Sequence, residues 1–264
     1  MFQRCALLAL MVLPVIALGQ TKMLSEVCAD PPQQKSCIGA NSALALVFPG
    51  SRQSQSEALL SPGKTASLVY LQRLSLTGAE PLALGIAEVV EKDAATGTRP
   101  DCRACVPNMV MSVFEFTQGQ WRVAAQSKAM DGVGGGGQLR TDLKTVDLGR
   151  RRLLIAMETG FTGQGVTETV EAYYFANLES SGRLSRAVID IGFIPTGTYS
   201  CGSGLGQEEW IIETDVLVLR KTDLMPEFLT VRTDLPCKGN KAAQSSAPVM
   251  YRVNAKTLKI ERAR

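Results

Sequence analysis

Four acidic side chains could carry chemistry in this sequence if they share one cleft. They are Glu158, Glu168, Glu171 and Asp190, and all four fall on neighbouring predicted strands. Two carboxyl groups on either side of a glycosidic bond can hydrolyse it, one as general acid and the other as base or nucleophile. Acidic residues on strands also mark the solvated face of a sheet. A carboxylate-dependent glycan hydrolase therefore stays open as an alternative function, which close acids facing an aromatic cleft would favour.

Histidine is absent from all 264 residues. Its absence excludes Ser-His-Asp and Cys-His nucleophilic sites and any His-ligated metal centre. We expect no catalytic residue of these kinds, no metal and no cofactor. The aromatic residues that could stack on a sugar are few: Trp121, Trp210, Tyr173, Tyr174 and Tyr199.

The stretch DGVGGGGQLR, residues 131–140, contains the dinucleotide-binding spacing G-x-G-x-x-G at Gly132, Gly134 and Gly137. A predicted strand precedes it, and Glu158 lies at the distance expected of a ribose-binding acid. The helix that could follow is only about ten residues long and ends at Gly149, too short for a crossover connection. No second βαβ unit follows it. We therefore interpret the glycines as a mobile surface turn and expect no dinucleotide cofactor.

The chain has seven cysteines, and six remain once Cys5 is set aside in the N-terminal segment. Six cysteines allow 15 pairings. Proximity in the sequence favours structural disulfides between the pairs Cys28–Cys37, Cys102–Cys105 and Cys201–Cys237. Redox or zinc chemistry at the C-x-x-C of Cys102 and Cys105 is less favoured, because a strand pattern follows it where a thioredoxin-like site has a helix.

Residues 1–19 have the pattern of a signal peptide. Arg4 precedes an apolar run over residues 5–17, and the small residues Ala17 and Gly19 suit cleavage after Gly19. The pattern predicts an exported protein, periplasmic or secreted, in which disulfides persist.

Charge and hydropathy exclude two classes of partner. Without Arg4, 27 basic residues face 25 acidic ones, so we expect no nucleic-acid partner. No apolar run after residue 19 approaches the ~20 residues that span a bilayer, so we expect no stable membrane insertion.

Alternating apolar and polar residues predict ten or eleven strands between residues 65 and 262. The turn sequences at 117–120, 180–182 and 254–256 are short enough to close hairpins. The strands are expected near 65–76, 82–91, 109–117, 120–127, 151–159, 166–177, 183–193, 209–220, 227–233, 248–253 and 257–262.

Sequential hairpins predict a mainly β fold, an antiparallel meander that forms a sandwich or a curled barrel. A propeller is the rival architecture. Short N-terminal helical segments are expected at 22–29 and 54–60. No linker interrupts the chain, so residues 20–264 are interpreted as a single disulfide-stapled β domain.

These patterns favour an exported, soluble, β-rich binding or interaction protein of a bacterial-type cell envelope, without catalytic activity. Its partner would be a protein or another envelope component. The segment 192–209, GFIPTGTYSCGSGLGQEE, is expected to be a surface loop held by Cys201 and to contact the partner. Tyr199, Ser203 and Trp210 are the candidate contact residues.

Overall fold

The computed structural model describes residues 26–29, 36–54, 57–74, 76, 80–92, 107–135, 138–139, 142–163, 166–182, 184–201, 210–219, 225–237 and 243–263. Within these ranges the fold is mainly β, and sixteen strands belong to one continuous sheet. The described strands close no barrel, because the strand order has two ends, β3 and β20. The mainly β, antiparallel prediction is confirmed.

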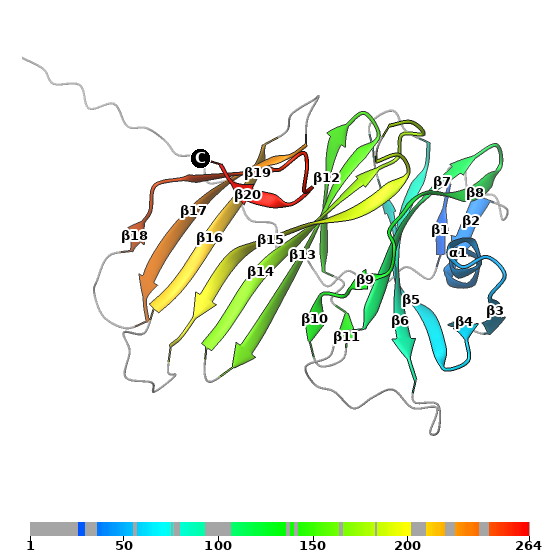
Figure 1. Ribbon diagram of the computed structural model, residues 1–264, viewed down its shortest axis with the longest axis horizontal. Coiled ribbons are helices and arrows are strands. Elements are labelled where there is room, and N and C mark those ends of the chain that lie inside the picture. The colour runs from blue at the N-terminus through cyan, green and yellow to red at the C-terminus, as the bar shows by residue number, and fades with distance from the viewer. Residues whose placement is uncertain are drawn as a thin grey trace, which may run out of the picture.

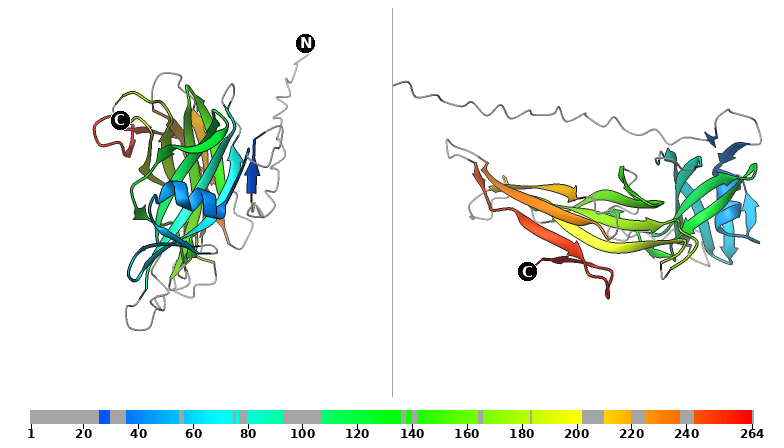
Figure 2. Two further views of the ribbon diagram at one scale, coloured as in Figure 1. Left: turned by 90° about the vertical axis from the view of Figure 1, so that its right-hand side faces the viewer. Right: turned by 90° about the horizontal axis from the view of Figure 1, so that it is seen from above.

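The sheet has two halves, which lie at opposite ends of an elongated molecule (Figures 1 and 2). The N-terminal half contains β3 (Arg52–Ser54), β4 (Glu57–Ser61), β5 (Lys64–Leu74), β6 (Leu82–Glu91), β7 (Asn108–Thr117), β8 (Gln120–Gln126) and β9 (Met130–Asp131). The C-terminal half contains β12 (Leu143–Gly149), β13 (Arg152–Gly163), β14 (Val166–Asn177), β15 (Ala187–Tyr199), β16 (Trp210–Leu219), β17 (Glu227–Pro236), β18 (Gln244–Ser245), β19 (Val249–Val253) and β20 (Ile260–Arg262).

Local sequence explains the hairpins. The turn between β7 and β8 has two residues, and both Gln118 (φ 53°) and Gly119 (φ 78°) are left-handed. Two-residue hairpin turns need positive φ at their central positions, because that geometry matches the twist of the strands. The predicted turns at 180–182 and 254–256 likewise connect β14 to β15 and β19 to β20.

The central strand β6 is buried along most of its length. Its residues 82–89, LALGIAEV, are all buried, because β6 lies between β5 and β7 and both of its faces are covered. One face joins a core shared with β13 and β14 of the C-terminal half. The other face lies in a core covered by helix α1 (Ala40–Val47), β1 (Glu26–Cys28) and β2 (Cys37–Gly39).

A short helix forms in the N-terminal part as expected, but not at the two predicted positions within the described residues. Residues 26–28 of the first form strand β1, paired with β2, and most of the second belongs to β3 and β4. Pairing with β5, as in Ala58 opposite Ala66, wins over the weak helical preference of so short a segment. The helix that does form, α1, begins after Gly39 without a side-chain cap, so the sequence has no capping signal that would predict its start.

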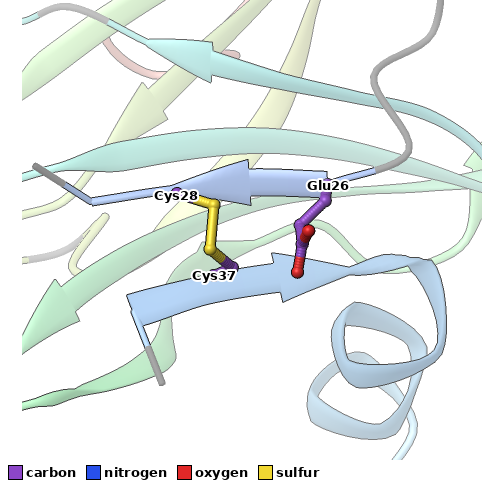
Figure 3. Close-up of side chains that lie close together, drawn as sticks. All are labelled: Glu26, Cys28 and Cys37. Atoms are coloured by element: carbon purple, nitrogen blue, oxygen red, sulfur yellow. A yellow bond between two sulfur atoms is a disulfide. The ribbon is translucent and has the colours of Figure 1, made fainter. Parts of the chain in front are cut away.

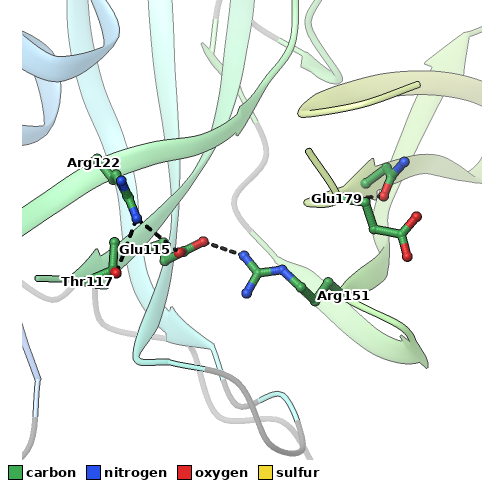
Figure 4. Close-up of polar contacts among 6 residues, drawn as sticks. Glu115, Thr117, Arg122, Arg151 and Glu179 are labelled. Atoms are coloured by element: carbon green, nitrogen blue, oxygen red, sulfur yellow. Dashed lines mark hydrogen bonds and ion pairs between the residues drawn. The ribbon is translucent and has the colours of Figure 1, made fainter. Parts of the chain in front are cut away.

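The two halves join where β8 meets β15 through the single parallel pair Gln126 and Ala187. An ion pair reinforces this junction: Arg151, in the β12–β13 turn, contacts Glu115 of β7 (Figure 4). The Glu115 side chain is only 12% exposed, and its other oxygen lies 3.9 Å from Arg122. A carboxylate this buried needs cationic partners, and here they come from both halves.

A third core lies within the C-terminal half. It unites one face of β12–β15 with side chains from β16, β17, β19 and β20. The C-terminal hairpin folds back toward β15, where Lys259 Nζ lies 2.7 Å from Asp190 Oδ2. Phe228 of β17 is fully buried here, against the ring of Tyr173 at a centroid distance of 4.6 Å.

Candidate functional site

The candidate site is a cavity of about 330 Å³ where β15 and β16 separate. These two long strands pair at only three positions among the described residues, Gly197–Tyr199 with Ile211–Glu213. Beyond them the strands diverge, and we call the space between them the fork cavity. Its lining is mostly polar and, among the described residues, consists of Lys144, Glu158, Thr169, Glu171, Thr196, Tyr199, Glu213, Thr214, Asp215 and Val216.

The pairing of β13 with β14 brings two of the acids noted in the sequence together in the fork cavity. Glu158 of β13 lies directly opposite Glu171 of β14. Glu171 is only 7% exposed, and both of its oxygens accept hydrogen bonds. Lys144 Nζ lies 3.2 Å from one oxygen, and the Tyr173 hydroxyl donates to the other.

The phenol of Tyr173 is a fixed donor to this carboxylate. Burial raises the pKa of Tyr173 well above its ordinary value, and the hydrogen bond to Glu171 and the charge of Glu171 raise that pKa further. Tyr173 therefore remains protonated at neutral pH. Its ring packs on Phe228, which connects the polar floor of the cavity to the C-terminal core.

A bulge in β15 shapes the wall of the cavity. Val170 pairs with Pro195 and Thr169 with Gly197, so Thr196 is the extra residue. Its hydroxyl lies 3.2 Å from that of Thr169. A Cβ at Gly197 would lie 2.6 Å from the Thr169 hydroxyl oxygen, so only glycine fits this close approach.

Of the four acids that could have shared one cleft, two line the fork cavity, Glu158 and Glu171. Glu168 is not part of the lining and alternates with Thr169, which places it on the other face of β14. Asp190 instead pairs with Lys259 of the C-terminal hairpin. Sequence reasoning missed Lys144, Glu213 and Asp215. The alternation of residues along β16 could have indicated that Glu213 and Asp215 share one face of that strand. Their position near β13, however, depends on where β15 and β16 separate.

The three predicted contact residues lie as follows. Tyr199 lines the fork cavity and is 38% exposed. Trp210 begins β16, opposite Pro236 of β17. Ser203 lies outside the described residues. The expected loop over 192–209 is wrong in extent, because residues 192–199 belong to β15 and pair with β14.

Two of the predicted disulfides are present. Cys28–Cys37 joins paired positions of β1 and β2, beside the Glu26 carboxylate (Figure 3). Cys201–Cys237, with a Cα–Cα distance of 5.6 Å, ties the ends of β15 and β17 on either side of β16. Cys102 and Cys105 lie outside the described residues. Two disulfides indicate an oxidising, extracytoplasmic environment.

We expect Cys28, Cys37, Cys102, Cys105, Cys201 and Cys237 all to be oxidised in protein purified from an exported fraction. The reason is their even number and the two bonds already seen. Alkylation without reductant, followed by mass measurement, should add no alkyl group to these six cysteines. Alkylated thiols at Cys102 and Cys105 would instead favour redox or metal chemistry there.

The glycine stretch forms no dinucleotide-binding unit in the described residues. β10 (Gly134–Gly135) and β11 (Gln138–Leu139) pair as a small antiparallel hairpin. The residues that a crossover helix would need form β12, which is antiparallel to β13. The turn interpretation agrees with this arrangement.

A second cavity, of about 560 Å³, lies beside the turn between β19 and β20 and includes Arg252, Asn254 and Lys256. The Asn254 side chain serves the turn, because its oxygen accepts from the backbone N–H of Lys256 at 2.8 Å. Of the predicted contact residues, neither Tyr199 nor Trp210 is among its described lining residues. The fork cavity is therefore the stronger candidate.

A comparison with protein-family models, with curated proteins and with solved structures finds no match to this chain. The functional interpretation therefore rests on the geometry of the site. In the part of the chain that the structure describes, no helix has the length and apolar character needed to cross a membrane.

Three buried phenols predict a response to alkali. Burial raises the pKa of Tyr70 to about 12, and it raises the pKa of Tyr173 and Tyr174 further. Because these folded-state pKa values exceed the ordinary value of 10.0, the stability they confer is full below about pH 10 and is lost as the pH rises toward 12. In a titration at 295 nm, the three should stay protonated at about pH 11 and ionise together on unfolding. Gradual ionisation of all tyrosines near pH 10 would contradict this.

Proposed function

We propose that the chain is an exported, β-rich binding protein of a bacterial-type cell envelope, periplasmic or secreted, that holds its partner at the fork cavity without transforming it. The observation that carries the proposal is the cavity itself. It is polar, lies where two strands part, and has Tyr199 in its lining, two residues from the Cys201–Cys237 bond. A rigid sheet with a tied end is a suitable support for such a contact surface.

The state of Glu171 favours binding over catalysis. In carboxylate hydrolysis one carboxyl donates a proton and the other acts as base or nucleophile. Both oxygens of Glu171 already accept from Lys144 and Tyr173, so neither faces a substrate without a competing donor. The volume of about 330 Å³ lies within the range of ligand pockets, roughly 300–1,000 Å³, so the cavity has room for part of a partner.

One observation supports the glycan hydrolase as a second candidate. Glu158 and Glu171 face each other across paired strands, where Cβ atoms lie about 4.5–5.5 Å apart. Retaining glycosidases hold their two carboxyl groups about 5–5.5 Å apart, a separation that side chains at paired strand positions can reach. Tyr199 could stack on a sugar ring beside them.

A two-arm experiment tests the proposal. The purified protein is crosslinked in an extract of its native envelope, alongside Tyr199→Ala and the remote control Glu91→Gln, whose side chain is exposed and paired with Lys64. We expect a partner captured by the wild type and by the control but lost with Tyr199→Ala. In the second arm, reducing ends released from envelope glycan are measured. Release by the wild type that disappears in Glu158→Gln would overturn the binding function in favour of the hydrolase.

A further inference from the structure

The fork cavity opens onto the edge of a strand. Four consecutive residues of β16, Glu213 to Val216, line it. One face of a strand contributes only alternate residues, so a consecutive run means that the cavity meets the strand from the side. The backbone N–H and C=O groups of β16 are therefore part of its wall.

This edge of β16 has no strand against it in the described part of the chain. On its other side β16 pairs with β17 along its whole length, from Trp210 to Leu219. On the cavity side its pairing with β15 stops at Glu213. An open edge of this kind is a template for one further strand.

The opposite edge, of β15, is less suited to receive a strand. Pro195 has no N–H to donate. Lys259 Nζ already donates to the backbone oxygen of Asp190, at 3.1 Å. The receptive edge is therefore residues 214–219 of β16.

The charges of the lining indicate what an added strand would carry. Among the described lining residues there are four carboxylates, those of Glu158, Glu171, Glu213 and Asp215, and one ammonium, that of Lys144, which gives a formal excess of three negative charges. Lys144 is committed to Glu171. A cationic side chain entering the cavity would complement the other three carboxylates.

We propose that the fork cavity takes an extended segment of a partner protein that carries lysine or arginine and adds as a strand along the open edge of β16. The inference rests on the binding function proposed above and names the class of partner. Backbone hydrogen bonds to residues 214–219 supply affinity, and the attraction of the cation to the acidic lining supplies specificity.

The test uses short blocked peptides as probes, with binding measured by fluorescence anisotropy. The first alternates threonine with lysine, the second alternates threonine with glutamate, and the third is the lysine peptide N-methylated at alternate backbone amides. Nα-acetyl-lysine amide provides a lone cation. We expect binding of the lysine peptide, no binding of the glutamate peptide, and an affinity about tenfold lower after N-methylation, because at least two backbone hydrogen bonds are lost.

Matched variants locate the contact. The double variant Glu213→Gln, Asp215→Asn should lower the affinity for the lysine peptide at least about fivefold and make that affinity less dependent on salt. Glu91→Gln should leave both the affinity and its salt dependence unchanged. No binding of the lysine peptide, or equal binding of its N-methylated form, would overturn the inference. If acetyl-lysine amide binds as well as the peptide, the cavity takes a lone cation and the inference is also wrong. If none of the peptides binds but Tyr199→Ala still abolishes capture of an envelope partner, the proposed binding function stands and only the added-strand inference is wrong.

Discussion

Replacing Phe228 by alanine is expected to lower the free energy of unfolding by about 3–5 kcal/mol, the usual range for a buried phenylalanine. Phe228 is 0% exposed and packs on Tyr173 with ring centroids 4.6 Å apart. Side chains from both sides of the C-terminal core surround it, so the space left behind has few ways to collapse. Urea denaturation followed by circular dichroism measures the loss.

Leu217→Ala is the matched control. Leu217 lies on the neighbouring strand β16 but is 58% exposed. Its removal should change stability by no more than about 0.5 kcal/mol. A loss below about 1 kcal/mol for Phe228→Ala would mean that the C-terminal strands do not share a packed core. Because Phe228 supports Tyr173, and Tyr173 donates to Glu171, Phe228→Ala should also loosen the floor of the fork cavity.

Removing the second disulfide with Cys201→Ser and Cys237→Ser is the other large change. The two cysteines are 36 residues apart in the sequence. A loop of that length corresponds to about 4 kcal/mol in the chain-entropy model of disulfide stabilisation. The nine-residue separation of Cys28 and Cys37 corresponds to only about 2.5 kcal/mol. Removing the C-terminal disulfide should therefore lower the midpoint of denaturation more than removing the N-terminal one.

The same double variant should weaken partner binding while the protein stays folded. The bond holds β15 and β17 together across the start of β16, next to Tyr199. Without it these strand ends gain conformational freedom that binding must remove. Folding is checked by circular dichroism and binding by capture of the envelope partner. Unchanged binding would place the contact surface elsewhere, and complete unfolding would mean that the bond is a staple of the core.

The sequence pattern located strands even where both faces are buried, since the expected 82–91 matches β6 in full. The expected 166–177 matches β14 in full, and β5, β7, β8 and β16 differ only at their ends. The strand near 183–193 was predicted too short, because Gly192, Pro195 and Gly197 look like loop residues. In the structure they occupy irregular positions where the register between β14 and β15 shifts. A bulge depends on the partner strand, so local sequence cannot place it.

The site was less accessible to sequence reasoning than the strands. Glu158 and Glu171 could be grouped because β13 and β14 are joined by a short connection, which fixes their register. Glu213 and Asp215 could not be assigned to the same cavity. Their position depends on β15 and β16 parting after three residue pairs, and that separation follows from the packing of β16 and β17 over the C-terminal core.

The burial of β6 on both faces has a consequence for the exchange of its amide hydrogens with solvent. Its neighbours β5 and β7 bond its backbone on both sides, so no small opening exposes it. The amides of β6 should exchange only when the molecule unfolds globally, and their rates report its full stability. Strands β3 and β20, at the two ends of the sheet, should exchange orders of magnitude faster through local fraying.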